Sequence, residues 1–403
     1  MLRRHQRALL FAVLAAAAAL LAWSSTATGD YTVELQPAVE ALLQGDVGEF
    51  LARAPIYGPS VLPRAPFLFT ANAAGAGTIG VYLAGVFACL LVVALLAWVV
   101  DARLCALGRE PLVRAAVVIA VLLAPWLLRA GALGHPEEAM TGALCAIAVL
   151  AALDGRVTWA GLALGAAVAF KPWALLAAGP VLCAARNGRA RLLVWALGVC
   201  VVLELPFLLE RPGGARSTAE AAAKTPNIFH PHQLFWLLHE HVTSARTGAT
   251  GDRGPQLLRD WAHPLIVATG IPATLAFAWR LRARAVSRVD ALALLAFLLL
   301  LRSVLDPWNT IYYAIPAVLA LAIWEGLTKE GLPWRALLVS GLGYLSFRVA
   351  PNHLSDDWQS ATYLIWMVPA VVVLGLEAFG LRRWGDRQAT SSATAERTAD
   401  AST

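Results

Sequence analysis

Charged residues are scarce in this chain: Asp, Glu, Lys and Arg make up 14% of its 403 residues, whereas 59% are hydrophobic. Soluble domains carry about 25% charged residues, so this composition excludes an ordinary water-soluble surface. Repeated apolar runs near twenty residues match the thickness of the hydrocarbon core of a bilayer. Because lipid offers no hydrogen-bonding partner to the backbone, such runs must be helical. The sequence therefore predicts an all-α, polytopic membrane protein.

Cysteine is rare as well, with five residues and no C-x-x-C motif. This pattern indicates neither a zinc cage nor a disulfide framework. The net charge of +6 arises from Arg clusters of the kind that mark cytoplasmic loops. It therefore does not indicate a nucleic-acid partner.

The basic start, residues 1–7, is placed in the cytoplasm and precedes an apolar run over 8–23. A cleaved signal peptide is the alternative; we favour an uncleaved first span because the chain continues to cross the membrane afterwards. Counting onward, with Arg clusters on the cytoplasmic side, gives about twelve transmembrane helices. One polytopic domain covers 1–384, with large outer loops at 25–78 and 210–262. Residues 385–403, rich in Ser, Thr and Ala, form a disordered cytoplasmic tail.

Two segments need separate treatment. The stretch 157–185 is long for one helix, and Lys171-Pro172 interrupts it, because proline removes a helix hydrogen bond and disfavours helix at the residue before it. Two short passes that meet at Lys171 near the outer face are predicted. In the first outer loop, apolar residues recur at helical spacing between Leu35 and Leu51. This predicts an amphipathic helix lying flat in the interface, with a helix packed in an outer domain as the alternative.

The predicted topology gathers several charged residues at the outer face. Asp30 follows the first span, and a partly desolvated carboxylate there is suited to act as a general base, or simply to cap a helix. His135, Glu137 and Glu138 open a later span. Helix capping explains one of these acids but not the whole set, which favours a functional site. His135 with one of these glutamates could hold a metal, but no spacing supplies further ligands, so no metal is predicted.

Three cations complete the candidate set. Lys171, between two apolar runs, must either extend to the interface or meet an anion such as a phosphate or an outer carboxylate. Arg302 lies four residues before Asp306 at the outer end of a span. The two form an i, i+4 pair, or Arg302 serves as a bidentate phosphate ligand. Arg348 is a weaker candidate for the same role.

Several of these motifs occur together in one known family. They are Gly29-Asp30-Tyr31, Ile56-Tyr57-Gly58-Pro59, Phe170-Lys171-Pro172 and the turn from Asp306-Pro-Trp-Asn to Tyr313. Together they resemble the GT-C glycosyltransferases of family 87, the polyprenyl-phosphate-mannose-dependent mannosyltransferases of actinobacteria. The resemblance implies a GT-C-like fold and Asp30 as the catalytic base. A second acidic residue is usual in such enzymes, and Glu34 or Glu137 would supply it.

The function expected from this resemblance is inverting transfer of a hexose, with mannose favoured, from a polyprenyl-phosphate donor. The acceptor would be a lipid or glycan of the cell envelope, at the extracytoplasmic face of the bacterial plasma membrane. Lys171, Arg302 and Arg348 would bind the donor phosphate, and no cofactor is required. The alternative is a transporter or flippase of a lipid-linked sugar. Transporters place their sites near the midplane, often in inverted repeats, and neither feature is evident here.

Overall fold

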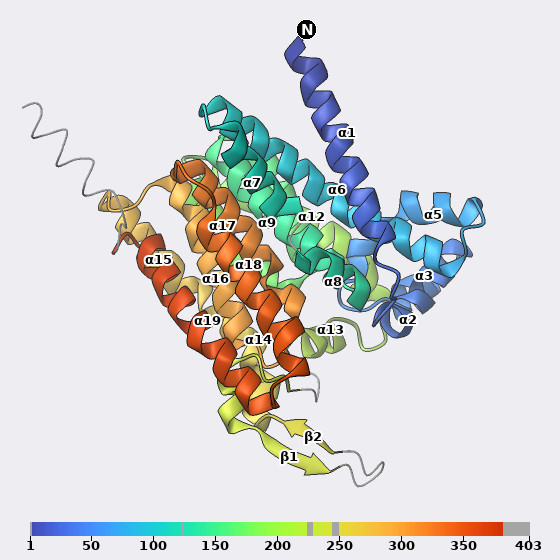
Figure 1. Cartoon of the computed structure of the whole chain (residues 1–403). Helices are drawn as coiled ribbons and strands as arrows, with labels where there is room; N and C mark the ends of the chain where they lie inside the picture. The colour runs from blue at the N-terminus through green and yellow to red at the C-terminus, as the bar shows by residue number, and fades with distance from the viewer. Residues whose placement is uncertain (1, 123–124, 224–228, 244–249, 382–403) are drawn as a thin grey trace, which may run out of the picture.

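The computed structural model describes residues 2–122, 125–223, 229–243 and 250–381. These residues form a bundle of helices, and the strands among them make one small antiparallel hairpin (Figure 1). The predicted all-α class is confirmed. The predicted tail, 385–403, lies outside the described residues.

Seven helical segments in the described part of the chain are long and apolar enough to cross a bilayer. They are α1 (Leu2–Trp23), α6 (Gly77–Ala106), α7 (Pro111–Leu122) with α8 (Pro125–Leu133), α12 (Arg189–Glu210), α14 (Gln256–Ala268) with α15 (Gly270–Arg282), η5 (Ile311–Ala314) with α17 (Ile315–Thr328), and α19 (Asp356–Ala378). Shorter helices complete the bundle: α9 (Glu137–Leu153), α10 (Val157–Phe170), η2 (Pro172–Ala177), α11 (Ala178–Ala184), η4 (Arg288–Asp290), α16 (Ala291–Leu305) and α18 (Trp334–Tyr344). Leu20 of α1 and Val202 of α12 are largely exposed, as on a face that lipid covers.

Smaller elements lie beyond the helix ends. The first group is α2 (Tyr31–Glu34), α3 (Gln36–Leu43), α4 (Val47–Arg53), η1 (Gly58–Val61) and α5 (Ala65–Ala73). The second is α13 (Gly214–Ala223), η3 (Leu234–Leu238), β1 (Glu240–Thr243) and β2 (Thr250–Arg253), followed later by η6 (Leu345–Val349) and η7 (Ala350–Asn352). In the hairpin, His241 lies opposite Asp252.

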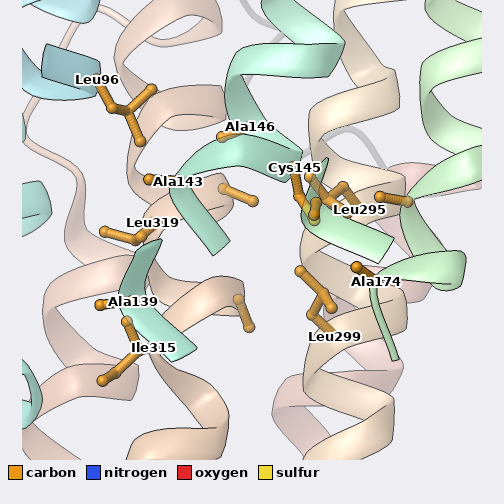
Figure 2. Packing of buried hydrophobic residues seen from close by; sticks show 14 of the residues in the cluster. Leu96, Ala139, Ala143, Cys145, Ala146, Ala174, Leu295, Leu299, Ile315 and Leu319 are labelled. Atoms are coloured by element: carbon orange, nitrogen blue, oxygen red, sulfur yellow. The ribbon is translucent and has the colours of Figure 1, made fainter. Parts of the chain in front are cut away.

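Helix α9 is the centre of the core and packs against α6, α10 and α17. Its side chains are mostly small, which lets neighbouring helices approach closely. Figure 2 shows Ala139 and Ala143 of α9 near Leu319 of α17. A Cβ added at Gly142 would lie 2.9 Å from the Cα of Pro316. The position of α9 is therefore tightly fixed, and so is that of the residues at its first turn.

The two ends of the bundle differ in charge. At one end, Arg103 pairs with Asp154 at 2.6 Å, and Arg109 donates a hydrogen bond to the carbonyl of Leu327. Other basic residues of the same end are Arg114, Arg156, Arg280, Arg282, Arg284, Arg288 and Arg335. Glu137 begins α9 at the opposite end, where the other candidate site residues also lie.

A backbone crossing places Asp30 at this second end. The amide of Asp30 donates to the carbonyl of Leu133 at 3.0 Å. Gly29 and Gly134, on the two crossing segments, both have positive φ (45° and 96°). A Cβ at Gly134 would lie 2.5 Å from the amide nitrogen of Tyr31. Only glycine therefore allows the turn before α9 to approach the segment that carries Asp30.

The predicted break at Lys171 is confirmed: α10 ends at Phe170, Lys171 is extended, and η2 begins at Pro172. The single flat helix predicted between Leu35 and Leu51 is instead two helices, α3 and α4. They are separated at Gly45, whose φ is 85°. Phe50 is buried against Phe207 of α12, with ring centroids 5.5 Å apart, so α4 packs on the bundle.

The backbone crossing can be tested with two matched glycine substitutions. Gly134→Ala and Gly75→Ala both place a side chain at positive φ, which costs about 1–2 kcal/mol. Only at Gly134 would the new Cβ also collide with neighbouring backbone; at Gly75 nothing lies within 4 Å. We expect the thermal midpoint of the detergent-solubilised protein to fall clearly further for Gly134→Ala. Equal decreases in the thermal midpoint would mean that the two backbone segments at Gly134 do not approach each other as closely as in this structure.

Candidate functional site

Six ionisable side chains form a continuous row with alternating charge at one end of the bundle. His135 is its first link: Nε2 lies 3.3 Å from Asp30 Oδ2, and Nδ1 lies 2.9 Å from Glu137 Oε1. The same oxygen of Glu137 is 2.9 Å from Lys171 Nζ. We call Asp30, His135, Glu137, Lys171, Glu138 and Arg302 the charged row. Its first half joins the segment after α1, the first turn of α9 and the break before η2.

Glu138 connects the second half of the row. Its Oε1 lies 3.4 Å from Lys171 Nζ and accepts a hydrogen bond from Trp173 Nε1 at 3.2 Å. Its Oε2 lies 3.5 Å from Arg302 Nη1. Neighbouring residues of a helix point in different directions, so Glu137 reaches His135 while Glu138 reaches Arg302.

Apart from Asp30, which is half exposed, the row is largely buried, and its formal charges balance. Glu137 and Glu138 are 0% and 2% exposed, and Arg302 is 4% exposed. Three carboxylates face three cations when His135 is protonated. Removing one partner of a buried pair leaves an uncompensated charge and costs about 3–5 kcal/mol. The row must therefore form as a unit.

The protonation of His135 follows from its surroundings. Burial alone would lower the pKa of this imidazole, but hydrogen bonds to Asp30 and Glu137 outweigh that effect and raise the pKa to about 9. The hydrogen bond between His135 and Asp30 also lowers the pKa of the Asp30 carboxyl below its ordinary value, although partial burial acts in the opposite direction. At neutral pH, His135 is a cation and Asp30 an anion.

Aromatic rings surround the two longer cations. Lys171 Nζ lies 4.3 Å from the ring centroid of Tyr57. Arg302 Cζ lies 4.6 Å from the ring of Trp173 and 4.2 Å from that of Tyr313. Cation–π contacts of this kind stabilise a desolvated cation by about 2 kcal/mol. These rings also form flat apolar walls beside the charged row.

The row borders a cavity of about 830 Å³, a size that accommodates a small organic ligand. Charged and polar groups on its wall come from Glu34, His135, Glu138, Lys171, His263, Arg302 and Asp306. Its apolar wall includes Pro172, Leu175, Pro264, Ile266 and Val267. Asp30, whose side chain is 51% exposed, does not line the cavity itself; it adjoins the cavity through His135, with which it pairs at 3.3 Å. The wall of the cavity thus contains both cations and carboxylates, and Asp30 lies one residue behind it.

The structure brings together most of the residues selected from the sequence. Glu34 lines the cavity and accepts a hydrogen bond from Tyr57 Oη at 2.5 Å. Asp306 also lines it, but it forms its ion pair with His263 at 3.4 Å, and the i, i+4 pair with Arg302, one of the two alternatives, is not formed in the described structure. Arg348 is exposed within the π-helical turn η6 and does not line the cavity.

The aromatic residues of the site and His263 were not among the site residues predicted from the sequence, although Tyr57 and Tyr313 lie in motifs that carry the family resemblance. Tyr57, Trp173, Tyr312 and Tyr313 line the cavity, yet in the sequence they resemble the many aromatics of membrane interfaces. A usable signal existed for Trp173, because it follows the Lys171-Pro172 break directly. His263 lies inside α14, in a stretch for which no motif was recognised.

Single ligand atoms of Asp30, Glu34 and His135 lie within 4.8 Å of one another. Both ring nitrogens of His135 face carboxylates, Nε2 that of Asp30 and Nδ1 that of Glu137. In the structure, His135 therefore orients Asp30.

Comparison with protein-family models and with curated proteins finds no match to this chain. The geometry of the site therefore carries the functional argument.

The charge of His135 can be tested through pH. A pKa raised from 6.5 to about 9 contributes stability that is present below pH 6.5 and is lost as the pH rises through 9. We expect His135→Gln to lower the thermal midpoint at pH 7.5, and the difference from the wild type to shrink by pH 10. A difference that is constant across this range would show that His135 is neutral in the folded protein.

Proposed function

We propose that this chain is a polytopic membrane glycosyltransferase. It transfers a hexose, mannose in the family it resembles, from a polyprenyl-phosphate donor to a lipid or glycan acceptor of the cell envelope. The observation that carries the proposal is the cavity: Lys171 and Arg302 lie in its wall, and Asp30 adjoins it through His135, at one end of an apolar bundle. The proposal includes a GT-C-like fold with about twelve transmembrane passes. The seven long helices and the shorter apolar helices would together make up these passes.

The charge difference between the two ends supports the orientation. Lys and Arg concentrate on the cytoplasmic side of membrane proteins, which assigns the Arg103–Asp154 end to the cytoplasm. The charged row and the cavity then face the outside of the bacterial plasma membrane. Nucleotide sugars are absent there, so an activated sugar must arrive on a lipid carrier. A donor of this kind carries one phosphate group between sugar and lipid.

Arg302 is the best-placed ligand for that phosphate. Its Nη1 has no hydrogen-bond partner, and its distance of 3.5 Å from Glu138 is too long for a strong hydrogen bond. A guanidinium offers paired donors that match phosphate oxygens. Lys171 lines the same cavity but is held between Glu137 and Glu138. We therefore assign Arg302 the direct contact and Lys171 the role of holding charge in the wall.

The proposed reaction inverts the configuration at the anomeric carbon of the transferred sugar. The acceptor hydroxyl oxygen attacks this carbon and forms the new glycosidic bond as its proton passes to Asp30. The bond between the anomeric carbon and the phosphate oxygen breaks, and the electron pair leaves with polyprenyl phosphate. Arg302 stabilises the charge that grows on this leaving group. The rings of Tyr57, Trp173 and Tyr312 offer flat surfaces for the apolar face of a sugar.

Asp30→Asn tests the proposed base. We expect transfer of labelled mannose from polyprenyl-phosphate mannose in membranes to fall by about 10²-fold or more, because general bases contribute 10²–10⁴ in rate. Glu49→Gln, which alters a half-exposed carboxylate on α4, is the matched control and should leave transfer unchanged. Normal turnover by Asp30→Asn would remove Asp30 from the mechanism. Donor movement across the membrane without consumption would instead establish a flippase.

Arg302→Lys tests the phosphate contact while conserving the charge that balances Glu138. The ammonium cannot reproduce the paired donors of the guanidinium. We expect KM for the polyprenyl-phosphate donor to rise about tenfold, with little change in KM for the acceptor. Unchanged donor kinetics would mean that Arg302 serves only to balance Glu138.

A further inference from the structure

A second cluster of metal-binding side chains lies on the β1–β2 hairpin, which extends from the bundle in Figure 1. His239 directly precedes β1, His241 lies within it, and Asp252 lies in β2. His241 and Asp252 are directly opposite in the strand register. Residues i and i+2 of a strand share a face, so the sequence His-Glu-His brings both imidazoles to the carboxylate.

The three ligand atoms converge. Asp252 Oδ1 lies 2.5 Å from His241 Nδ1 and 3.8 Å from His239 Nε2. One atom from each residue lies within 4.8 Å of the other two. Bonds of about 2.0–2.2 Å to Zn²⁺ need adjustments of only about an ångström from these positions. Two imidazoles and one carboxylate are a ligand set that first-row divalent cations prefer.

The remaining nitrogen of His239 supports this assignment. Its Nδ1 lies 2.8 Å from the carbonyl oxygen of Trp236. Donation of the Nδ1 proton to that carbonyl leaves the lone pair on Nε2, the atom that faces Asp252. Metal-bound histidines almost always have such a partner, which fixes the tautomer and the ring orientation. The Trp236 ring also stacks on His239, with centroids 4.3 Å apart.

Asp252 supplies a second observation. Its Oδ1 is buried and makes no hydrogen bond of acceptable geometry, although His241 Nδ1 is close. A buried carboxylate oxygen requires a cationic partner. A divalent cation between the carboxylate and the two rings would satisfy all three groups at once.

We propose that His239, His241 and Asp252 bind one divalent cation of the zinc class, independently of the sugar-transfer cavity. The hairpin is tied to the bundle, because Trp236 Nε1 donates to Asp357 Oδ1 at 2.8 Å. In the same segment, His230 N donates to the Pro307 carbonyl beside Asp306. The cation would therefore rigidify the segment around His230 and Trp236, which contacts the turn that carries Asp306.

The test uses the full chain without a polyhistidine tag, purified in detergent and stripped of metal with a chelator. It is titrated with Zn²⁺ by calorimetry, and with Co²⁺ while visible absorption is recorded. We expect one equivalent of Zn²⁺ to bind and the intense absorption of four-coordinate Co²⁺ to appear. Asp252→Asn and His241→Ala should each weaken binding at least about tenfold, since even the loss of an outer partner has such an effect.

His353→Ala is the matched control, because it removes an exposed histidine from the turn before α19; it should bind Zn²⁺ as the wild type does. His241 is 80% exposed, so its loss leaves the core intact, and an unchanged thermal midpoint of the metal-free variant verifies this. The proposal is overturned if the wild type binds no Zn²⁺, or if both ligand variants bind it with unchanged affinity. Sugar transfer by metal-free protein is a separate measurement and decides nothing about this site.

Discussion

The burial of two adjacent carboxylates at the first turn of α9 is the constraint on which the rest of the site depends. Glu137 and Glu138 lie at the head of α9, where the helix dipole favours negative charge but both side chains are almost completely buried. Each must therefore find a cation from another segment. Lys171 and Arg302 come from the ends of α10 and α16, so one electrostatic requirement fixes the relative positions of three helices.

This requirement also shows how the site can be stable and still suit the proposed transfer. Buried pairs compensate one another, so the deep wall of the cavity keeps a fixed charge pattern before any ligand binds. Pre-arranged charge of this kind costs no reorganisation when negative charge develops on a departing phosphate. Asp30 is the exception, because it is half exposed and its side chain pairs with His135 alone among the described residues of the row. The carboxylate that we propose as the base is the one that the row holds least tightly.

The charged residues of the site could be located from the sequence because few charges occur in apolar surroundings. The Arg clusters predict which loops lie on the same side of the membrane. The break at Lys171 followed from the chemistry of proline. The sequence did not predict which charged residues form pairs. The contact between Lys171 and Glu137 depends on packing between helices distant in sequence, and so does the contact of Asp306 with His263 rather than with Arg302. Arg348 looked equivalent to Arg302 in the sequence, but the π-helical turn leaves it exposed. The hairpin was missed because its short strands, Glu240–Thr243 and Thr250–Arg253, are mostly polar and show no alternation.

We propose that the charged row and its cavity open outside the cytoplasm. The Lys171 side chain is only 11% exposed, so more accessible positions nearby must report the side of the membrane on which the site lies. Val33 is 82% exposed beside the site, and the exposed native Cys105 lies at the basic end. In intact cells, a membrane-impermeant maleimide should label Val33→Cys, while Cys105 should react only after permeabilisation. Labelling of Cys105 in intact cells, with position 33 protected until permeabilisation, would contradict the account.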